Sequence, residues 1–123
     1  MVAELPMVLV EPSAGRSVWI TESRWQGHII ERHPEMADYL EEVCSTITDP
    51  GMIWYADLPE RELFYRLVRS GKYANTWIRC VIDFRGSRGL DGALPAELKT
   101  AHVMTNLPIR RGGGLKWMAP RLL

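Results

Sequence analysis

The chain has 123 residues, of which 46% are hydrophobic and 24% charged, and its fifteen basic residues balance its fifteen acidic ones. These values are typical of one folded domain, so we expect a single domain over residues 1–123 and exclude a disordered or collagen-like chain. The longest apolar runs fall far short of the roughly 20 residues that a membrane-spanning helix needs, so no membrane segment is expected.

The cysteines and the start of the sequence indicate a cytoplasmic protein. The first residues lack a basic stretch followed by a long apolar core, so no secretory signal is expected. Cys44 and Cys80 are the two cysteines. A lone pair of cysteines in a chain without an export signal is more typical of two buried, reduced thiols than of a disulfide.

The zero net charge hides an asymmetry between the two halves of the sequence. Residues 1–62 contain four basic and twelve acidic residues, whereas residues 63–123 contain eleven basic and three acidic ones. The halves therefore carry net charges of −8 and +8. Such a split indicates either an anionic partner for the basic side or two halves that neutralise each other within one fold.

Two helices are expected in the first half. Thr21 is a suitable cap for the first helix, in which four residues follow at helical spacing: Trp25, His28, Ile29 and Arg32. Pro34 ends this helix and suits the first position of the next one. The second helix is expected from Glu35 to about Thr48, where the apolar residues recur with a helical period, and Asp49-Pro50-Gly51 ends it.

After residue 51 the apolar period changes to two, which predicts strands. We expect four of them, over Met52 to Ala56, Glu62 to Val68, Asn75 to Phe84 and about Thr100 to Leu107. The predicted fold is therefore α+β, with two N-terminal helices packed on one face of a four-stranded, mostly antiparallel sheet. The acidic residues would lie mainly on the helices, and the basic ones on the sheet and tail.

The sequence contains no pattern that predicts a metal or a nucleotide cofactor. His28 and His33 are five residues apart, about 140° around an ideal helix, so they do not share a face. The two cysteines lie in different predicted elements, and no glycine-rich phosphate loop is present. We therefore expect no metal and no cofactor.

The charged residues inside the predicted strands are the stronger candidates. Alternation places Arg66 on the side of Phe64 and Arg79 on the side of Trp77. An arginine in the middle of a strand is costly to bury without a partner, so each either meets a carboxylate or binds an anion. Asp83 is a candidate partner for Arg79. His28, on the apolar stripe of its helix, fits a packed core histidine as well as a functional one.

The first helix also carries a motif. The segment from Trp25 to Glu35 resembles the W-x-x-H-I-x-x-x-H-P-E signature of phage-associated nuclease-like domains, which are grouped with barnase, EndoU, the tRNA-cleaving colicins and RelE toxins. Later segments are similar to further motifs of this group in the same order, and they are residues 47–53, 64–66, 77–82, 103–105 and the basic tail that ends at Lys116-Trp117. The resemblance covers about residues 18–117.

The resemblance implies a barnase/RelE-like fold and metal-independent cleavage of RNA, in which a ribose 2′-hydroxyl attacks the adjacent phosphate. The positions that match the polar motif residues, and that we expect to be catalytic, are His28, His33, Arg66 and Thr105. A histidine would move protons near neutral pH, and an arginine would stabilise the phosphorane oxygens. We expect the RNA to be bound by Arg79, His102, Arg110, Arg111, Lys116 and Trp117.

Two other functions stay open. Asn106-Leu107 stand where the group has Ala-Tyr, which favours a non-catalytic RNA- or protein-binding module that kept the nuclease-like fold. A toxin-like ribonuclease would have an acidic antitoxin or immunity protein as its partner, because an acidic segment suits the same basic surface as RNA.

Overall fold

A computed structural model describes residues 5–85, 94–106 and 114–122. Over these residues the chain forms a seven-stranded sheet with the strand order β1-β2-β6-β5-β4-β3-β7. The strands are β1 (Met7–Val10), β2 (Ser17–Ile20), β3 (Met52–Tyr55), β4 (Arg61–Leu67), β5 (Trp77–Asp83), β6 (Ala96–Met104) and β7 (Gly114–Met118).

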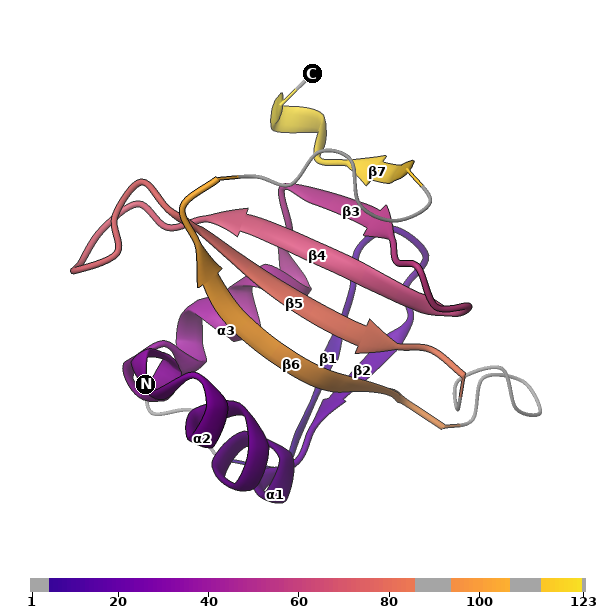
Figure 1. The fold of residues 1–123 in the computed structure, drawn as a ribbon. Coiled ribbons are helices and arrows are strands. Elements are labelled where there is room, and N and C mark those ends of the chain that lie inside the picture. Colours follow the sequence, from indigo (N-terminus) through magenta and orange to yellow (C-terminus); the bar gives the residue numbers. More distant parts are fainter. Residues whose placement is uncertain (1–4, 86–93, 107–113, 123) are drawn as a thin grey trace.

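The sheet is mixed. β2 runs parallel to β6, with Val18 opposite Ala96, and the other neighbouring pairs are antiparallel. Figure 1 shows that the sheet is strongly curled, so that the β1–β2 hairpin lies behind β4 and β5. The expected barnase/RelE-like fold, two helices on a four-stranded sheet, is therefore wrong. The predicted fold lacks β1, β2 and β7, whose four or five residues give little alternation, although the equally short β3 is predicted because Asp49-Pro50-Gly51 marks its start.

The first helical segment begins where the sequence predicts. Thr21 Oγ1 accepts a hydrogen bond from the Arg24 amide at 3.2 Å, so Thr21 caps α1 (Glu22–Arg24). The segment then widens into a π-helical turn (Trp25–Ile29) and continues as α2 (Ile30–Arg32). It ends at His33, whose backbone leaves the helical region, as expected for a residue before proline, in which the helical conformation is disfavoured.

The second predicted helix is divided. Pro34–Asp38 form a 3-10 helix, and Tyr39 leaves the helical conformation before α3 (Leu40–Thr48) begins. A further 3-10 turn (Pro120–Leu122) follows β7. The tertiary packing of Met36 and Tyr39, which are both buried, accounts for the break better than local propensity does.

The core lies between α3 and the concave side of the sheet. Val43 and Ile47 of α3 are fully buried, as are Phe64, Cys80 and Ile82 of the facing strands. Trp25 and Ile29 close the core at the β6 end. The side chains that alternate with this core set on β4, β5 and β6 point to the opposite face of the sheet, where Figure 1 draws no helix.

Both cysteines are free thiols, as the sequence predicts. Cys80 is buried and Cys44 half-buried. Burial raises the pKa of both thiols, so they stay protonated at neutral pH.

Candidate functional site

The structure brings together two histidines that are far apart in the sequence. His33 lies at the joint between α2 and the 3-10 helix, and His102 lies on β6. Their rings stack with centroids 5.1 Å apart and planes 25° from parallel. The Glu35 carboxylate lies 3.8 Å from Nδ1 of His33, within reach of an ion pair when that ring is protonated.

His102 belongs to a row of polar side chains that crosses three strands. Tyr65 on β4 is opposite Arg79 on β5, and Arg79 is opposite His102 on β6. Residues opposite one another in a ladder share a face of the sheet, so these three side chains lie side by side on the face opposite α3. With His33 stacked at its end, this row (Tyr65, Arg79, His102 and His33) is called here the cross-strand row.

The cross-strand row has unmet hydrogen-bonding capacity. Tyr65 OH, Arg79 Nε and His102 Nδ1 are buried and have no hydrogen-bond partner among the described residues. The indole nitrogen of Trp54, on the same face of β3, is a fourth such atom. Buried polar groups are nearly always paired in native proteins, so unpaired groups on one face mark a place where a polar ligand fits.

The electrostatics of the row suit proton transfer next to an anion. Burial, the Arg79 guanidinium and His33 lower the pKa of His102 to about 4, so its imidazole is neutral and able to accept a proton at pH 7. Arg79 forms no ion pair with a carboxylate in the described part of the chain. Its positive charge is therefore available to an anionic ligand.

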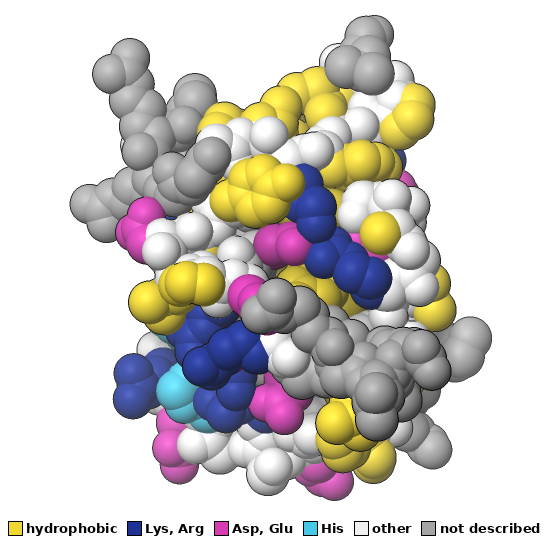
Figure 2. Space-filling view, turned by 90° about the vertical axis from the view of Figure 1, so that its right-hand side faces the viewer, with side chains coloured by type: hydrophobic (Ala, Val, Ile, Leu, Met, Phe, Trp, Pro, Cys, Tyr) yellow, Lys and Arg dark blue, Asp and Glu magenta, His cyan; other side chains and the backbone are white. Residues whose placement is uncertain are grey.

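His28 lies one helical turn from His33, in the π-helical turn. Partial burial and the nearby cations of Arg24 and Arg32 lower the pKa of His28. Figure 2 shows Lys and Arg side chains gathered around a histidine on the face that it draws, beside hydrophobic side chains. Because Arg24 and Arg32 are its neighbouring cations, His28 lies at a cationic edge of the site rather than in the cross-strand row.

Arg66, expected to be catalytic, lies elsewhere. It is opposite Ile78, on the core-facing side of the sheet, so it points away from Arg79. Its guanidinium donates to the Asp49 carboxylate at 2.9 Å and to the Asp49 carbonyl at 2.6 Å. Arg121 binds the second oxygen of the same carboxylate at 2.6 Å. Arg66 therefore holds the end of α3 to the sheet.

The other predicted residues are dispersed. Thr105 is exposed, just beyond the end of β6, and nothing in the described structure joins it to the cross-strand row. Lys116 donates to Glu62 at 2.8 Å, and Trp117 packs against the core, so both serve the fold. Arg110 and Arg111 lie outside the described residues.

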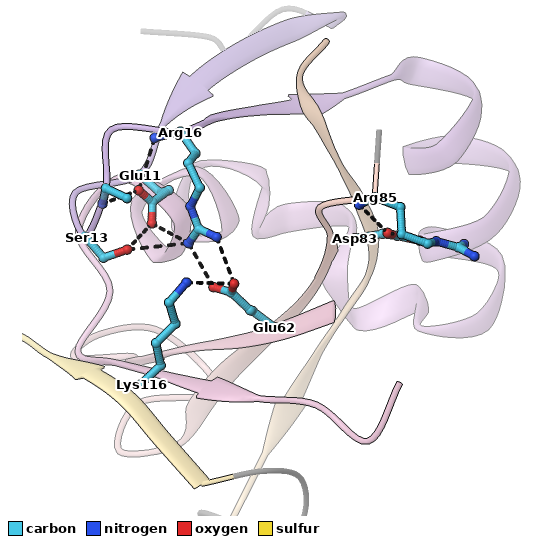
Figure 3. Close-up of polar contacts among 8 residues, drawn as sticks. Glu11, Ser13, Arg16, Glu62, Asp83, Arg85 and Lys116 are labelled. Atoms are coloured by element: carbon cyan, nitrogen blue, oxygen red, sulfur yellow. Dashed lines mark hydrogen bonds and ion pairs between the residues drawn. The ribbon is translucent and has the colours of Figure 1, made fainter. Parts of the chain in front are cut away.

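Lys116 is part of a second polar cluster, made of Glu11, Ser13, Arg16, Glu62 and Lys116. The Arg16 guanidinium donates to Glu62 at 2.7 and 2.8 Å and to Glu11 at 2.7 Å, and it lies 3.8 Å from the Phe84 ring. Figure 3 shows Arg16 between the two carboxylates, with Lys116 reaching Glu62 from β7. Hydrogen bonds from Arg16, Ser13 and two backbone amides outweigh burial and lower the pKa of Glu11 to about 2. The charges in this ionic cluster satisfy one another, so it closes the curled sheet between the β1–β2 turn, β4 and β7.

These contacts decide between the two interpretations of the charge asymmetry. Acidic residues of the first half pair with basic residues of the second at Glu62–Lys116, Asp49–Arg66 and Asp49–Arg121. Much of the asymmetry is thus neutralised within the fold. The exception on the cross-strand row is Arg79.

Tyr65 is a site residue that sequence reasoning missed. The segment Phe64-Tyr65-Arg66 attracted attention to its arginine, but alternation already placed Arg66 and Arg79 on sides defined by different neighbours. The missing information was the register of β4 and β5, which alone shows that Tyr65 and not Arg66 shares a face with Arg79.

Within the described ranges, no three His, Cys, Asp or Glu side chains are grouped as a metal site would need. No helix in that part of the chain is long and apolar enough to span a bilayer. Comparisons of the chain with protein-family models, with curated proteins and with solved structures find no match.

Proposed function

We propose that this domain is an endoribonuclease that cleaves RNA without a metal, and that the cross-strand row is its active site. One observation carries the proposal: His33 stacks on His102, which shares a face of the sheet with the Arg79 guanidinium and with several buried polar atoms, and among the described residues this guanidinium has no carboxylate partner and these atoms have no hydrogen-bond partner. A phosphodiester, with acidic oxygens and a neighbouring hydroxyl, is a ligand that matches these donors and acceptors.

Each residue of the row then has a role. His102, neutral at pH 7, accepts the proton of the 2′-hydroxyl as its oxygen attacks phosphorus. His33, beside Glu35, donates a proton to the 5′-oxygen as the P–O5′ bond breaks, which leaves a 2′,3′-cyclic phosphate and a 5′-hydroxyl. Arg79 and the Tyr65 hydroxyl stabilise the charge on the non-bridging oxygens. The resemblance of residues 25–35 to phage-associated nuclease-like domains supports the same chemistry.

The partner in this proposal is RNA, and the place of action is the cytoplasm. If the domain is toxin-like, an acidic antitoxin or immunity protein would inhibit it by covering Arg79. The same row in a protein that binds RNA without cutting it would make the domain a binding module, and the experiment below separates the two.

The test is cleavage of total RNA in EDTA by the wild type and by four alanine variants. We expect His33→Ala, His102→Ala and Arg79→Ala each to lower kcat/KM at least about a hundredfold, the usual effect of losing one acid–base or charge-stabilising group. Arg66→Ala is the matched control, because it removes an arginine from the same strand pair but from the opposite face, and it should retain activity. The cleavage products should carry 2′,3′-cyclic phosphate ends. A 2′-deoxy substrate should give no cleavage products.

The dependence of kcat/KM on pH provides a second test, because a residue with a purely structural role would not shift this profile. The acid limb of kcat/KM should lie near pH 4, the pKa of His102, and Arg79→Gln should move it toward higher pH because a neighbouring cation is lost. Salt-sensitive binding without new ends would instead identify a binding module, and full activity of Arg79→Ala would refute the assignment.

A further inference from the structure

The same face of the sheet has a second feature near the opposite end of β5 and β6. Trp19 on β2 is opposite Glu97 on β6, and Glu97 is opposite Asp83 on β5. Asp83 and Arg79 have the same parity on β5, so both point to the face of the cross-strand row. They are four residues apart, which is about 13 Å along a strand at roughly 3.3 Å per residue.

Trp19 forms one wall of a pocket of about 240 Å³ whose other residues include Arg85, Lys99, Glu97 and Leu94. Its side chain is well exposed for a tryptophan, at 38%. A second hollow on the β2 side joins Trp19 to Arg24, the same arginine that lies near His28. Trp19 thus lies between a pocket lined by both cations and carboxylates and the hollow that contains Arg24.

The polar groups of the pocket have a defined arrangement. The Arg85 guanidinium donates hydrogen bonds to the Asp83 carboxylate oxygens at 2.7 to 3.2 Å. Two thirds of the Arg85 side chain are nevertheless exposed. A β-bulge opposite Val81 and Ile82 adds Lys99 to β6, and its ammonium lies 2.9 Å from Glu97. Bulges commonly re-aim a side chain in this way next to functional sites. The pocket therefore has an open aromatic ring beside two ion pairs, Arg85–Asp83 and Lys99–Glu97, and the Arg85 side chain stays accessible to an anion.

We infer that the Trp19 pocket is a subsite for one base of a single-stranded RNA whose scissile phosphate occupies the cross-strand row. This inference rests on the proposed function. Base stacking on an exposed aromatic ring, with cations for the neighbouring phosphates, is the usual chemistry of single-strand recognition. Val81 and Thr100, opposite each other on the same face, form the floor between the two positions.

The substrate is accordingly longer than a dinucleotide. A dinucleotide places one phosphate on the cross-strand row and leaves the Trp19 pocket unused, whereas a longer strand reaches both. The wild type should therefore cleave a single-stranded oligonucleotide with a higher kcat/KM than a dinucleotide, and a duplex of the same sequence should be a poor substrate.

The test compares Trp19→Ala with the wild type on both substrates. Loss of one stacking ring should lower kcat/KM for the oligonucleotide at least about fivefold, mainly through KM, and should leave dinucleotide cleavage unchanged. Trp19→Phe should restore most of the difference because it keeps a ring. Val8→Ala is the matched control, since Val8 is the exposed cross-strand neighbour of Trp19 on β1 and does not line the pocket.

A second measurement separates this inference from the proposed function. A labelled 2′-deoxy oligonucleotide cannot be cleaved by 2′-hydroxyl attack, so its binding reports on the subsite alone. Weaker binding by Trp19→Ala but not by Val8→Ala would support the subsite, even if the wild type cleaves nothing and the ribonuclease assignment fails. Equal binding by the wild type and Trp19→Ala, no binding by either, or an equal loss of cleavage on both substrates would overturn it. A Trp19-dependent complex with a protein in place of the oligonucleotide would also overturn it.

Discussion

At the scale of single residues, Tyr65 is the most informative position. Its side chain is 1% exposed, and its hydroxyl has no hydrogen-bond partner among the described residues. A buried hydroxyl without a partner costs folding free energy, because it has lost water and gained nothing in return. Such a cost is typical of groups that serve a ligand rather than the fold.

Tyr65→Phe should therefore separate stability from function. Removing the hydroxyl breaks no hydrogen bond to another described residue, so the free energy of unfolding should stay the same or rise by up to about 1 kcal/mol, measured by urea denaturation. Cleavage of RNA should fall, because the phosphate loses one donor.

Tyr39→Phe provides the comparison for this prediction. The Tyr39 hydroxyl accepts a hydrogen bond from the Tyr73 amide at 3.3 Å, so its removal should lower stability by about 1 kcal/mol. A Tyr65→Phe protein that is destabilised as much as Tyr39→Phe would show that the Tyr65 hydroxyl is bonded in solution and belongs to the fold.

At the scale of elements, the sequence predicts β4 and β5 to within two residues, but it predicts the last strand at about Thr100 to Leu107, whereas β6 spans Ala96–Met104. Thr21, Pro34 and Asp49 mark helix boundaries because their effects on the backbone are local. The strands β4 and β5 are predicted because each has seven residues with alternating apolar side chains. β1 and β2 pair as a local hairpin, but the places of β2 and β7 in the sheet are defined by partners far along the chain, β6 and β3. The residues within such a short strand do not predict which distant strand it pairs with.

The difference between local patterns and long-range pairing also explains how much of the candidate site the sequence predicts. The sequence indicates His33 and His102 as candidates because histidine can transfer protons near neutral pH. It indicates Arg79 because an arginine inside a strand is costly to bury without a carboxylate or an anionic ligand. Their convergence depends on the register of three strands and on the stacking of a helix end against β6. Alternation places Arg66 correctly on the side of Phe64, but its partner Asp49 lies at the end of α3, and this pairing does not follow from local sequence.

The cap of α1 gives a prediction at this scale. Thr21→Ala removes the hydrogen bond to the Arg24 amide and should lower the free energy of unfolding by about 1 kcal/mol in urea denaturation. Thr48→Ala is a suitable control, because the Thr48 hydroxyl donates to the Cys44 carbonyl of an already bonded helix and caps nothing. The cap would have no role in stability if both variants unfolded at the same urea concentration.

At the scale of the whole molecule, the ionic cluster around Arg16 makes stability depend on pH. Glu11 is fully buried, and its pKa falls from an ordinary value of 4.5 to about 2 in the folded protein. The pKa of Glu62 is lowered too, by Arg16 and Lys116 against the opposing effect of burial. Carboxylates of this kind stabilise the fold above their unfolded pKa, and that contribution is lost as the pH falls toward the folded value.

We therefore expect the free energy of unfolding to decrease between about pH 5 and pH 2, by on the order of 2 kcal/mol for Glu11. Glu11→Gln should be less stable than the wild type at pH 7 and should show a shallower decrease over the same range. Thermal or urea denaturation across this pH range provides the measurement. Parallel curves for the two proteins would mean that Glu11 has the same affinity for protons in both states.

The parallel pairing of β2 with β6 determines when the sheet can be completed during synthesis of the chain. β2 is among the first strands to be synthesised, yet its parallel partner β6 is Ala96–Met104, so the N-terminal hairpin completes its pairing in the sheet only after most of the chain has been synthesised. The same late strand brings His102 to His33. A nascent chain therefore holds no assembled imidazole pair until β6 has been synthesised, and if the domain is the ribonuclease proposed above, its activity would begin only then.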